Sequence, residues 1–245
     1  MTASQSSQTV LVRYVYVDIV GYTLGRSVEA QVKITESLNR CINQTVAAFD
    51  VDSSKIIYLP TGDGACICLL GHADPLDFDI RISIMLMEKI HSLWLAESDE
   101  ESRFAIRIGL NENHDNMIYD IGGKRRNFVG MGVNNAHRLM SLAAPFQILM
   151  GPAVFQRLTQ RRLYKPNLYA LHGIVKHGEK VLCYGYHDPG LACFASMAHH
   201  RRQQSCKDSE ESPPASRQPL QLPLDSQGKP VRRRQDRQAK HSFKL

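Results

Sequence analysis

Residues 10–20, VLVRYVYVDIV, decide the fold together with the helical pattern that follows at residues 27–49. The run consists mainly of β-branched and aromatic residues, which is typical of a strand that is largely buried on both faces. After Gly21, apolar residues recur near helical spacing from Ser27 onward, and serine is a suitable residue to begin a helix. We therefore predict that a buried strand and a long amphipathic helix open the folded part of the chain.

The chain then alternates between strand and helix patterns up to about residue 190. KIIYLP and ACICLLG flank Gly62-Asp63-Gly64 and predict a tight hairpin. Further helices are predicted at about 75–96, 132–143 and 152–159, and further strands at 103–113, 146–150, 169–175 and 180–187, while 117–130 predicts a strand, a Gly-Gly turn and a short return strand. The order β-α-β-β-α-β with additions predicts one α+β, ferredoxin-like domain, with helices on one face of a mainly antiparallel sheet.

The composition is that of a globular protein, since 43% of the 245 residues are hydrophobic and 22% are charged. No stretch approaches the roughly 18 uninterrupted apolar residues of a membrane-spanning helix, and the polar residues 1–9 are typical of a flexible N-terminus rather than a signal peptide. We therefore expect a cytoplasmic protein. The six cysteines form no C-x-x-C pair, which indicates reduced, packed thiols and no structural zinc.

The net charge of +6 comes entirely from the C-terminal part of the sequence. Residues 196–245 carry eleven Lys and Arg against five Asp and Glu, whereas the first 195 residues carry nineteen of each. This segment is rich in Pro, Ser, Gln and Arg, so we predict a disordered basic tail. Its arginine run suits phosphate-rich partners, but such tails are more often solvated ends, and the neutral domain before it gives no reason to expect nucleic-acid binding.

Two acids lie at predicted strand ends in a chain that has no P-loop, G-x-S-x-G or H-E-x-x-H motif. Asp18 closes the first strand, and Asp63 lies at the tip of the hairpin. If these strands are neighbours, the carboxylates converge at one edge of the sheet, where they suit a pair of hard divalent cations. The alternative is that each aspartate only caps a turn, which is the commoner role of either one alone.

A second candidate pair lies in the helix predicted over GVNNAHRL. Asn134 and Arg138 are four residues apart, so both project from one face of that helix. The amide suits a ribose oxygen, and the guanidinium suits charge that grows on a phosphoryl group. Taken alone, such a pair is usually solvent-facing.

Four motifs together resemble the catalytic domain of class III nucleotidyl cyclases. They are VDIVGYT with Asp18, the hairpin tripeptide at 62–64, IRIGL at 106–110, and G-x-x-V-N-x-A-x-R at 130–138. Their order and spacing match the family, which implies a nucleotidyl cyclase domain at 10–190. The resemblance also implies a homodimer with shared active sites, in which the 3′-hydroxyl of a nucleoside triphosphate attacks the α-phosphate and pyrophosphate leaves.

The same resemblance implies a role for each site residue. Asp18, Asp63 and the Ile19 carbonyl would hold two divalent metal ions, Mn or Mg, on one protomer. Asn134 and Arg138 would arrive from the other protomer. Further substrate contacts would come from the backbone of three residues after the first strand and from a lysine in HGIVKHGEK: Gly21, Tyr22, Thr23 and Lys176.

Two positions depart from the purine cyclases of this family. Leu59 and Asn127 stand where adenylate cyclases place Lys and Asp or Thr, and where guanylate cyclases place Glu and Cys or a similar pair. Leu59 offers no hydrogen bond, and the Asn127 amide can pair with uracil or cytosine. Tyr58 is either a core residue or, if Pro60 shifts the strand register, a bulky side chain that narrows the pocket.

YLPTGDG thus resembles the pyrimidine cyclases of bacterial Pycsar antiphage defence, which implies UTP as substrate and cyclic UMP (cUMP) as a messenger read by a separate effector. Two alternatives remain open: a purine cyclase in signalling, and a degenerate domain that binds a nucleotide without catalysis. Inactive domains normally lose a metal-binding acid or the helix pair, whereas both pairs are present in this chain, so we expect an enzyme.

Overall fold

The computed structural model describes residues 8–71, 77–120, 122–174 and 180–195. Contacts divide the chain into Met1–Gln203 and Gln204–Leu245, and the second unit lies wholly outside the described part. The predictions for the tail at 196–245 and for Lys176 therefore lie outside it as well. The first strand begins at Gln8, so residues 8 and 9 belong to a strand and not to a flexible N-terminus.

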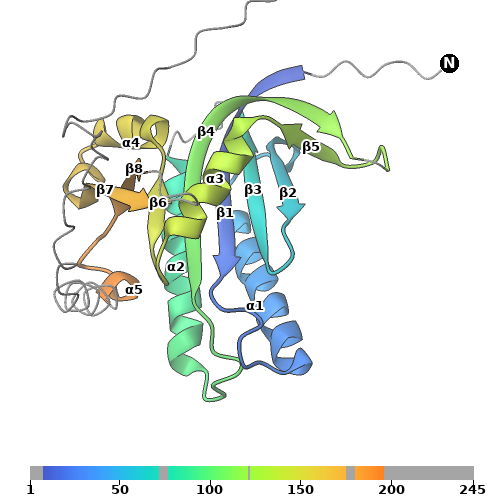
Figure 1. Ribbon diagram of the computed structural model, residues 1–245, viewed down its shortest axis with the longest axis vertical. Helices are drawn as coiled ribbons and strands as arrows, with labels where there is room; N and C mark the ends of the chain where they lie inside the picture. The colour runs from blue at the N-terminus through green and yellow to red at the C-terminus, as the bar shows by residue number, and fades with distance from the viewer. Residues whose placement is uncertain (1–7, 72–76, 121, 175–179, 196–245) are drawn as a thin grey trace, which may run out of the picture. The chain divides into compact units, whose positions relative to one another are not determined.

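The described strands form one sheet in the order β2-β3-β1-β4-β6-β8-β7, with β5 paired to β4 (Figure 1). Every pairing is antiparallel except that of β4 with β6, which confirms a mainly antiparallel sheet. The strands are β1 (Gln8–Ile19), β2 (Ile56–Pro60), β3 (Gly64–Leu70), β4 (Ile106–Tyr119), β5 (Arg126–Val129), β6 (Ile148–Met150), β7 (Leu168–Ile174) and β8 (Lys180–Tyr186). The central position of β1 agrees with its apolar sequence, because both of its faces are covered.

Helices cover both faces of the sheet. The α-helices are α1 (Val28–Ala47), α2 (Phe78–Ala96), α3 (Met131–Leu142), α4 (Pro152–Thr159) and α5 (Ala192–Ala195), and short 3₁₀ helices span Ser53–Lys55 and Lys165–Asn167. Val15 and Val17 of β1 pack in the core with α1 and α2, whereas Val12 and Tyr14 pack in a second cluster with α3. The expected α+β fold is confirmed, but the expectation that helices lie on one face is wrong for α3 (Figure 1).

A single long strand, β4, joins the strand predicted at 103–113 to the strand predicted from Met117, and β5 is the short return strand predicted after the Gly-Gly turn. The strand β4 runs unbroken for 14 residues, pairs with β6 near its start and carries the short β5 near its end. The hydrophobicity pattern does not predict one continuous strand, because the residues after Leu110 are polar. They pair with β1 and contact α3 instead of entering the main core. None of the helices in the described ranges has an apolar stretch of the length that a bilayer requires.

Candidate active site

Asp18 and Asp63 lie at the same edge of the sheet, as predicted. Asp18 of β1 is the register partner of Gly64 at the start of β3, and Asp63 immediately precedes that glycine. Gly62 has a φ of +91°, which favours glycine at this turn. A Cβ on Gly64 would lie 2.2 Å from the Val17 carbonyl oxygen, so the glycine allows the hairpin to close against β1.

Arg107 is a further residue of this edge, and its role was not predicted from the sequence. It lies opposite Asp18 on β4, and its Nε and Nη2 both lie 2.8 Å from Asp18 Oδ2. Burial raises the pKa of the Asp18 carboxyl, Arg107 opposes that shift, and the negative charge of Asp63 adds to it. The electrostatic effect of Asp63 agrees with two carboxylates that lie near each other. The arginine lies inside the motif IRIGL, but its role depends on the pairing of β4 with β1.

The loop after β1 presents the backbone that was assigned to the triphosphate. Gly21 and Thr23 are exposed, and Gly21 has a φ of +61°. The Ile19 side chain is buried in the core, so only its main chain can serve a ligand. Tyr22 is half-buried and its hydroxyl lies 3.0 Å from Thr35 Oγ1 on α1, which directs the ring toward the helix and leaves main-chain groups as the candidate contacts.

Asn134 and Arg138 are exposed on α3, which lies across β1 and β4. The Asn134 amide donates to the Gly130 carbonyl at 3.2 Å. Within the part of the chain that the structure describes, no ion pair or hydrogen bond engages the Arg138 guanidinium. Both side chains are therefore available on the surface of this face.

A buried carboxylate fixes the start of α3. Asp115 of β4 accepts hydrogen bonds from the Tyr14 hydroxyl at 2.6 Å, from the Gly132 N–H at 3.0 Å and from the Asn113 amide at 2.6 Å. A Cβ on Gly132 would lie 2.2 Å from Asp115 Oδ2, so glycine is required for this contact. The carboxylate supplies an acceptor and a negative charge to the first turn of the helix that carries Asn134.

The predicted base-reading residues lie on different faces of the sheet. Leu59 pairs with Cys66 and packs on the α3 face. Tyr58 pairs with Ile67, which belongs to the core on the α1 and α2 face. The Tyr58 side chain on that face is 43% exposed. The register continues without a shift through Pro60, because β2 is an edge strand where proline is tolerated. The expectation that Tyr58 narrows the base pocket beside Leu59 is therefore wrong.

Asn127 lies on β5, opposite Ile118 of β4. Its side-chain oxygen accepts a hydrogen bond from the Phe128 N–H at 2.8 Å, which leaves the amide nitrogen as the group that can meet a ligand. The next residue, Phe128, packs edge-on against Tyr14 with ring centroids 6.0 Å apart. This contact places Phe128 on the α3 face, so Asn127, one residue earlier on β5, lies on the opposite face from Phe128 and from Leu59.

Within one chain the two predicted pairs are only partly separated: Arg138 is three residues, or roughly 5 Å along the helix axis, before Ser141, whereas Asn134 is farther away. Arg107 Nη1 reaches the carbonyl of Ser141 at 3.4 Å, so the Asp18 edge lies near the end of α3. Asn134 is seven residues earlier, which corresponds to roughly 10 Å along the helix axis. Among the described residues no group of three or more His, Cys, Asp and Glu side chains is placed to hold a metal ion. A cation at this edge would rely on two carboxylates and main-chain oxygen.

Comparison with solved structures gives agreement in fold at low sequence identity. The adenylyl cyclase CyaB from P. aeruginosa is 17% identical, with 75% of this chain and 96% of that chain covered and a TM-score of 0.55. The guanylate cyclase domain of RhGC from Catenaria anguillulae, solved in complex with GTP, is 18% identical, with 72% and 96% covered and a TM-score of 0.55. The chain has the nucleotidyl cyclase fold.

A bacterial light-regulated adenylyl cyclase has the same fold, with a TM-score of 0.60, 16% identity and coverage of 75% of this chain and 53% of that chain. No protein-family model and no curated protein matches the sequence. The cyclase fold is thus established by structure, and the four sequence motifs all fall within it.

Proposed function

We propose that this protein is a nucleotidyl cyclase, which converts a nucleoside triphosphate to the 3′,5′-cyclic nucleotide and pyrophosphate. The observation that carries the proposal is the placement of two residue pairs within a cyclase fold. The carboxylate pair Asp18 and Asp63 lies at one sheet edge, and the Asn134 and Arg138 pair lies exposed on α3, which packs across β1 and β4. Each pair has the chemistry that phosphoryl transfer requires.

The carboxylate edge fits divalent cations in donor type. Asp18 and Asp63 provide hard oxygen ligands from adjacent strand ends, and the Ile19 main chain lies beside them. We assign two Mn²⁺ or Mg²⁺ ions to this edge, and bound ions supply positive charge that neutralises the triphosphate and acidifies the 3′-hydroxyl. Arg107 forms an ion pair with Asp18. We assign the same guanidinium to contact with a phosphate group that binds beside Asp18.

A second copy of the chain completes each site in this proposal. Because Asn134 and the Asp18 edge are separated along α3 in one chain, the exposed α3 pair serves the carboxylate edge of a partner related by two-fold symmetry. Asn134 orients the ribose so that its 3′-oxygen lies in line with the α-phosphate. Arg138 neutralises the charge that grows on the phosphoryl oxygens while the bond to pyrophosphate breaks.

The proposed substrate is UTP and the proposed product is cUMP, with CTP as the nearest competitor. This choice is supported by Leu59, which offers no hydrogen bond on the α3 face, and by Asn127, whose amide nitrogen can donate to a pyrimidine carbonyl. Tyr58 contributes nothing to it. A role as a messenger synthase in antiphage defence, with a separate effector, is proposed from the resemblance of YLPTGDG to the Pycsar cyclases.

A competition assay tests this proposal. The purified protein is incubated with equal amounts of ATP, GTP, CTP and UTP and with Mn²⁺, and the products are identified by mass. We expect cUMP as the main product and its loss in Asp63→Asn, but not in the matched variant Glu36→Gln, which removes an exposed carboxylate from α1. A purine cyclic nucleotide as the main product contradicts the base assignment, and no cyclic product from any substrate contradicts the cyclase assignment.

A further inference from the structure

Two loops far apart in the sequence meet at residues 21–23, whose main chain is assigned to the triphosphate and is called the phosphate cradle. The first connects β1 to α1 and contains Gly21, Tyr22 and Thr23. The second connects α2 to β4 and spans residues 97–105. The Val20 N–H donates to the Ala105 carbonyl at 2.9 Å, which places the ends of the two loops side by side.

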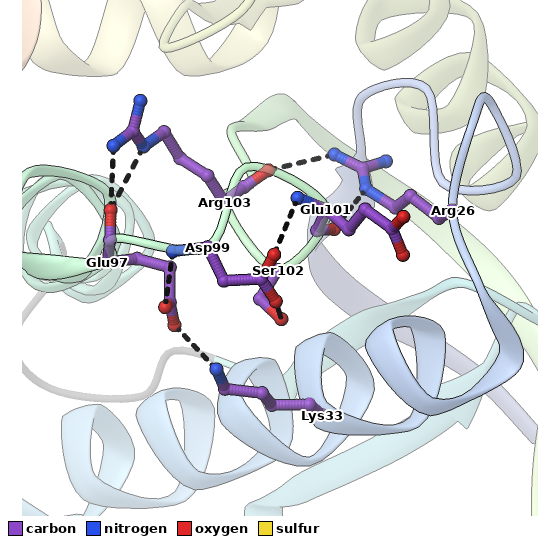
Figure 2. Close-up of polar contacts among 7 residues, drawn as sticks. All are labelled: Arg26, Lys33, Glu97, Asp99, Glu101, Ser102 and Arg103. Carbon is purple, nitrogen blue, oxygen red and sulfur yellow. Dashed lines mark hydrogen bonds and ion pairs between the residues drawn. The ribbon is translucent and has the colours of Figure 1, made fainter.

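The Arg26 side chain links these loops through their main chains. Its Nε donates to the Glu101 carbonyl at 2.9 Å, and its Nη2 donates to the Arg103 carbonyl at 2.9 Å (Figure 2). On the other side, Nη1 donates to the Gly21 carbonyl and lies 3.5 Å from the Val20 carbonyl oxygen. One guanidinium thus contacts carbonyl groups in both loops, which suits its fixed fork of donors.

The loop after α2 is itself held in place, so it gives Arg26 a fixed support. The Arg103 guanidinium donates to the Glu97 carbonyl at 2.7 and 3.2 Å, and the Glu97 carboxylate pairs with Lys33 of α1 at 2.9 Å (Figure 2). The Glu101 carboxylate accepts from the Ser27 hydroxyl at 2.7 Å and from the Ser27 N–H at 3.1 Å. These contacts bind the loop to the start of α1.

Because the peptide bond is planar, the contacts of Arg26 also fix the direction of the N–H groups of Gly21 and Tyr22. The C=O of one residue and the N–H of the next belong to one trans peptide plane and point in opposite directions. With the carbonyls of Val20 and Gly21 directed at Arg26, the N–H groups of Gly21 and Tyr22 are directed away from it. Gly21 is exposed, so a ligand can reach the main chain of this loop.

We propose that Arg26 is a positioning residue, which orients the main-chain N–H groups of Gly21 and Tyr22 toward the β- and γ-phosphates of the substrate. This inference rests on the proposed function, because that function places a triphosphate at the loop. Arg26 does not touch the reacting atoms. It adds positive charge behind the phosphate cradle and, together with the Leu24 N–H that also donates to the Gly21 carbonyl at 3.1 Å, keeps the carbonyl oxygens from turning toward the phosphates.

The test compares Arg26→Gln and Arg26→Lys with Arg103→Gln as the matched control. Arg103→Gln removes a guanidinium from the same loop, but that guanidinium contacts Glu97 and the Trp94 ring and none of residues 20–23. The measurements are binding of inorganic triphosphate with Mn²⁺ by calorimetry, and KM and kcat for the preferred nucleotide. Thermal unfolding of each variant reports whether it is folded.

We expect Arg26→Gln to weaken triphosphate binding and raise KM by roughly 10- to 100-fold, the range for lost hydrogen bonds from a charged donor, with a smaller change in kcat. Arg26→Lys should fall between Arg26→Gln and wild type, because an ammonium keeps the charge and loses the fork. If Arg26→Gln does not fold, the intermediate binding of Arg26→Lys carries the test. Arg103→Gln removes one contact of the supporting loop but keeps the main-chain carbonyls that Arg26 contacts, so its triphosphate binding should fall by much less than that of Arg26→Gln.

Two results overturn the inference. One is wild-type triphosphate binding in both Arg26 variants, and the other is an equal loss in Arg103→Gln, which would assign the effect to general loosening of the loop. Failure of the proposed function gives a different pattern. A wild-type protein that binds triphosphate but yields no cyclic nucleotide contradicts the cyclase assignment, and the comparison of the variants by calorimetry still decides the role of Arg26.

Discussion

Individual residues at the sheet edge show both what the sequence predicts and where it fails. Asp18 and Asp63 were predictable as neighbours because Asp18 lies at the end of one strand with a clear apolar pattern and Asp63 directly precedes another. The face on which Tyr58 lies was not predictable, because it depends on whether Pro60 shifts the register of β2 by one residue. Arg107 was missed because its role appears only when β4 is placed opposite Asp18.

The base-reading residues give a prediction at this scale. Leu59→Lys combined with Asn127→Asp introduces the pair that the resemblance assigns to adenylate cyclases. We expect the ratio of cyclic AMP to cUMP to rise by at least about tenfold in the competition assay, because charged hydrogen-bonding groups then meet the adenine edge. Tyr58→Ala is the control and should leave the ratio unchanged, since this side chain lies on the other face. Relaxed base choice in Tyr58→Ala would contradict the assignment of base recognition to Leu59 and Asn127.

At the scale of elements, β4 and α3 form the frame that holds the proposed catalytic pair, Asn134 and Arg138. The helix was predictable from GVNNAHRL, but its place on the face opposite α1 and α2 was not, because it depends on a close approach of two backbones. A Cβ on Gly109 would lie 2.2 Å from the Ala136 carbonyl oxygen, so α3 can lie on β4 only where glycine stands. A single glycine in a strand does not reveal which helix approaches it.

The hydrogen bond between Tyr14 and Asp115 tests this frame. Tyr14→Phe removes the hydroxyl that donates to the buried Asp115 carboxylate, so we expect the free energy of unfolding to fall by about 1–3 kcal/mol. The measurement is denaturant unfolding, with Tyr58→Phe as the control because its ring is partly exposed and no hydrogen bond to its hydroxyl is found among the described residues. Equal stability of Tyr14→Phe and wild type would show that Asp115 does not depend on this contact.

A buried ion pair on the other face holds α2 and α4 together. The Asp79 carboxylate has no exposed side-chain surface and accepts from Arg157 Nη2 at 2.5 Å, while Arg157 Nε lies 3.0 Å from Glu112 of β4. Asp79→Ala leaves the Arg157 charge undercompensated, so we expect a loss of about 3–5 kcal/mol in the free energy of unfolding. Lys33→Ala breaks an exposed pair and should leave stability nearly unchanged. A small loss in Asp79→Ala would contradict a structural role for the pair.

For the molecule as a whole, the sequence predicted the α+β class and the cyclase resemblance, because four motifs keep their order around a regular pattern of strands and helices. Their agreement with solved cyclases at 15–18% identity shows that the fold tolerates wide sequence change. The proposed division of the site between two chains rests on distance. Asp18 lies near the end of α3 and Asn134 near its start, so Asn134 is separated from the acids within one chain. Arg138, in contrast, lies only about one turn before Ser141.

Mixing two inactive variants tests the central claim most directly. Asp63→Ala lacks a metal-binding acid, and Arg138→Ala lacks the guanidinium of α3, so neither should make cyclic nucleotide alone. After subunit exchange, an equal mixture should recover about one quarter of wild-type activity, because half of the dimers are mixed and each mixed dimer has one intact site. Copurification of differently tagged variants shows that exchange has occurred. Exchanged dimers that make no product would contradict a cyclase site shared between two copies of this chain.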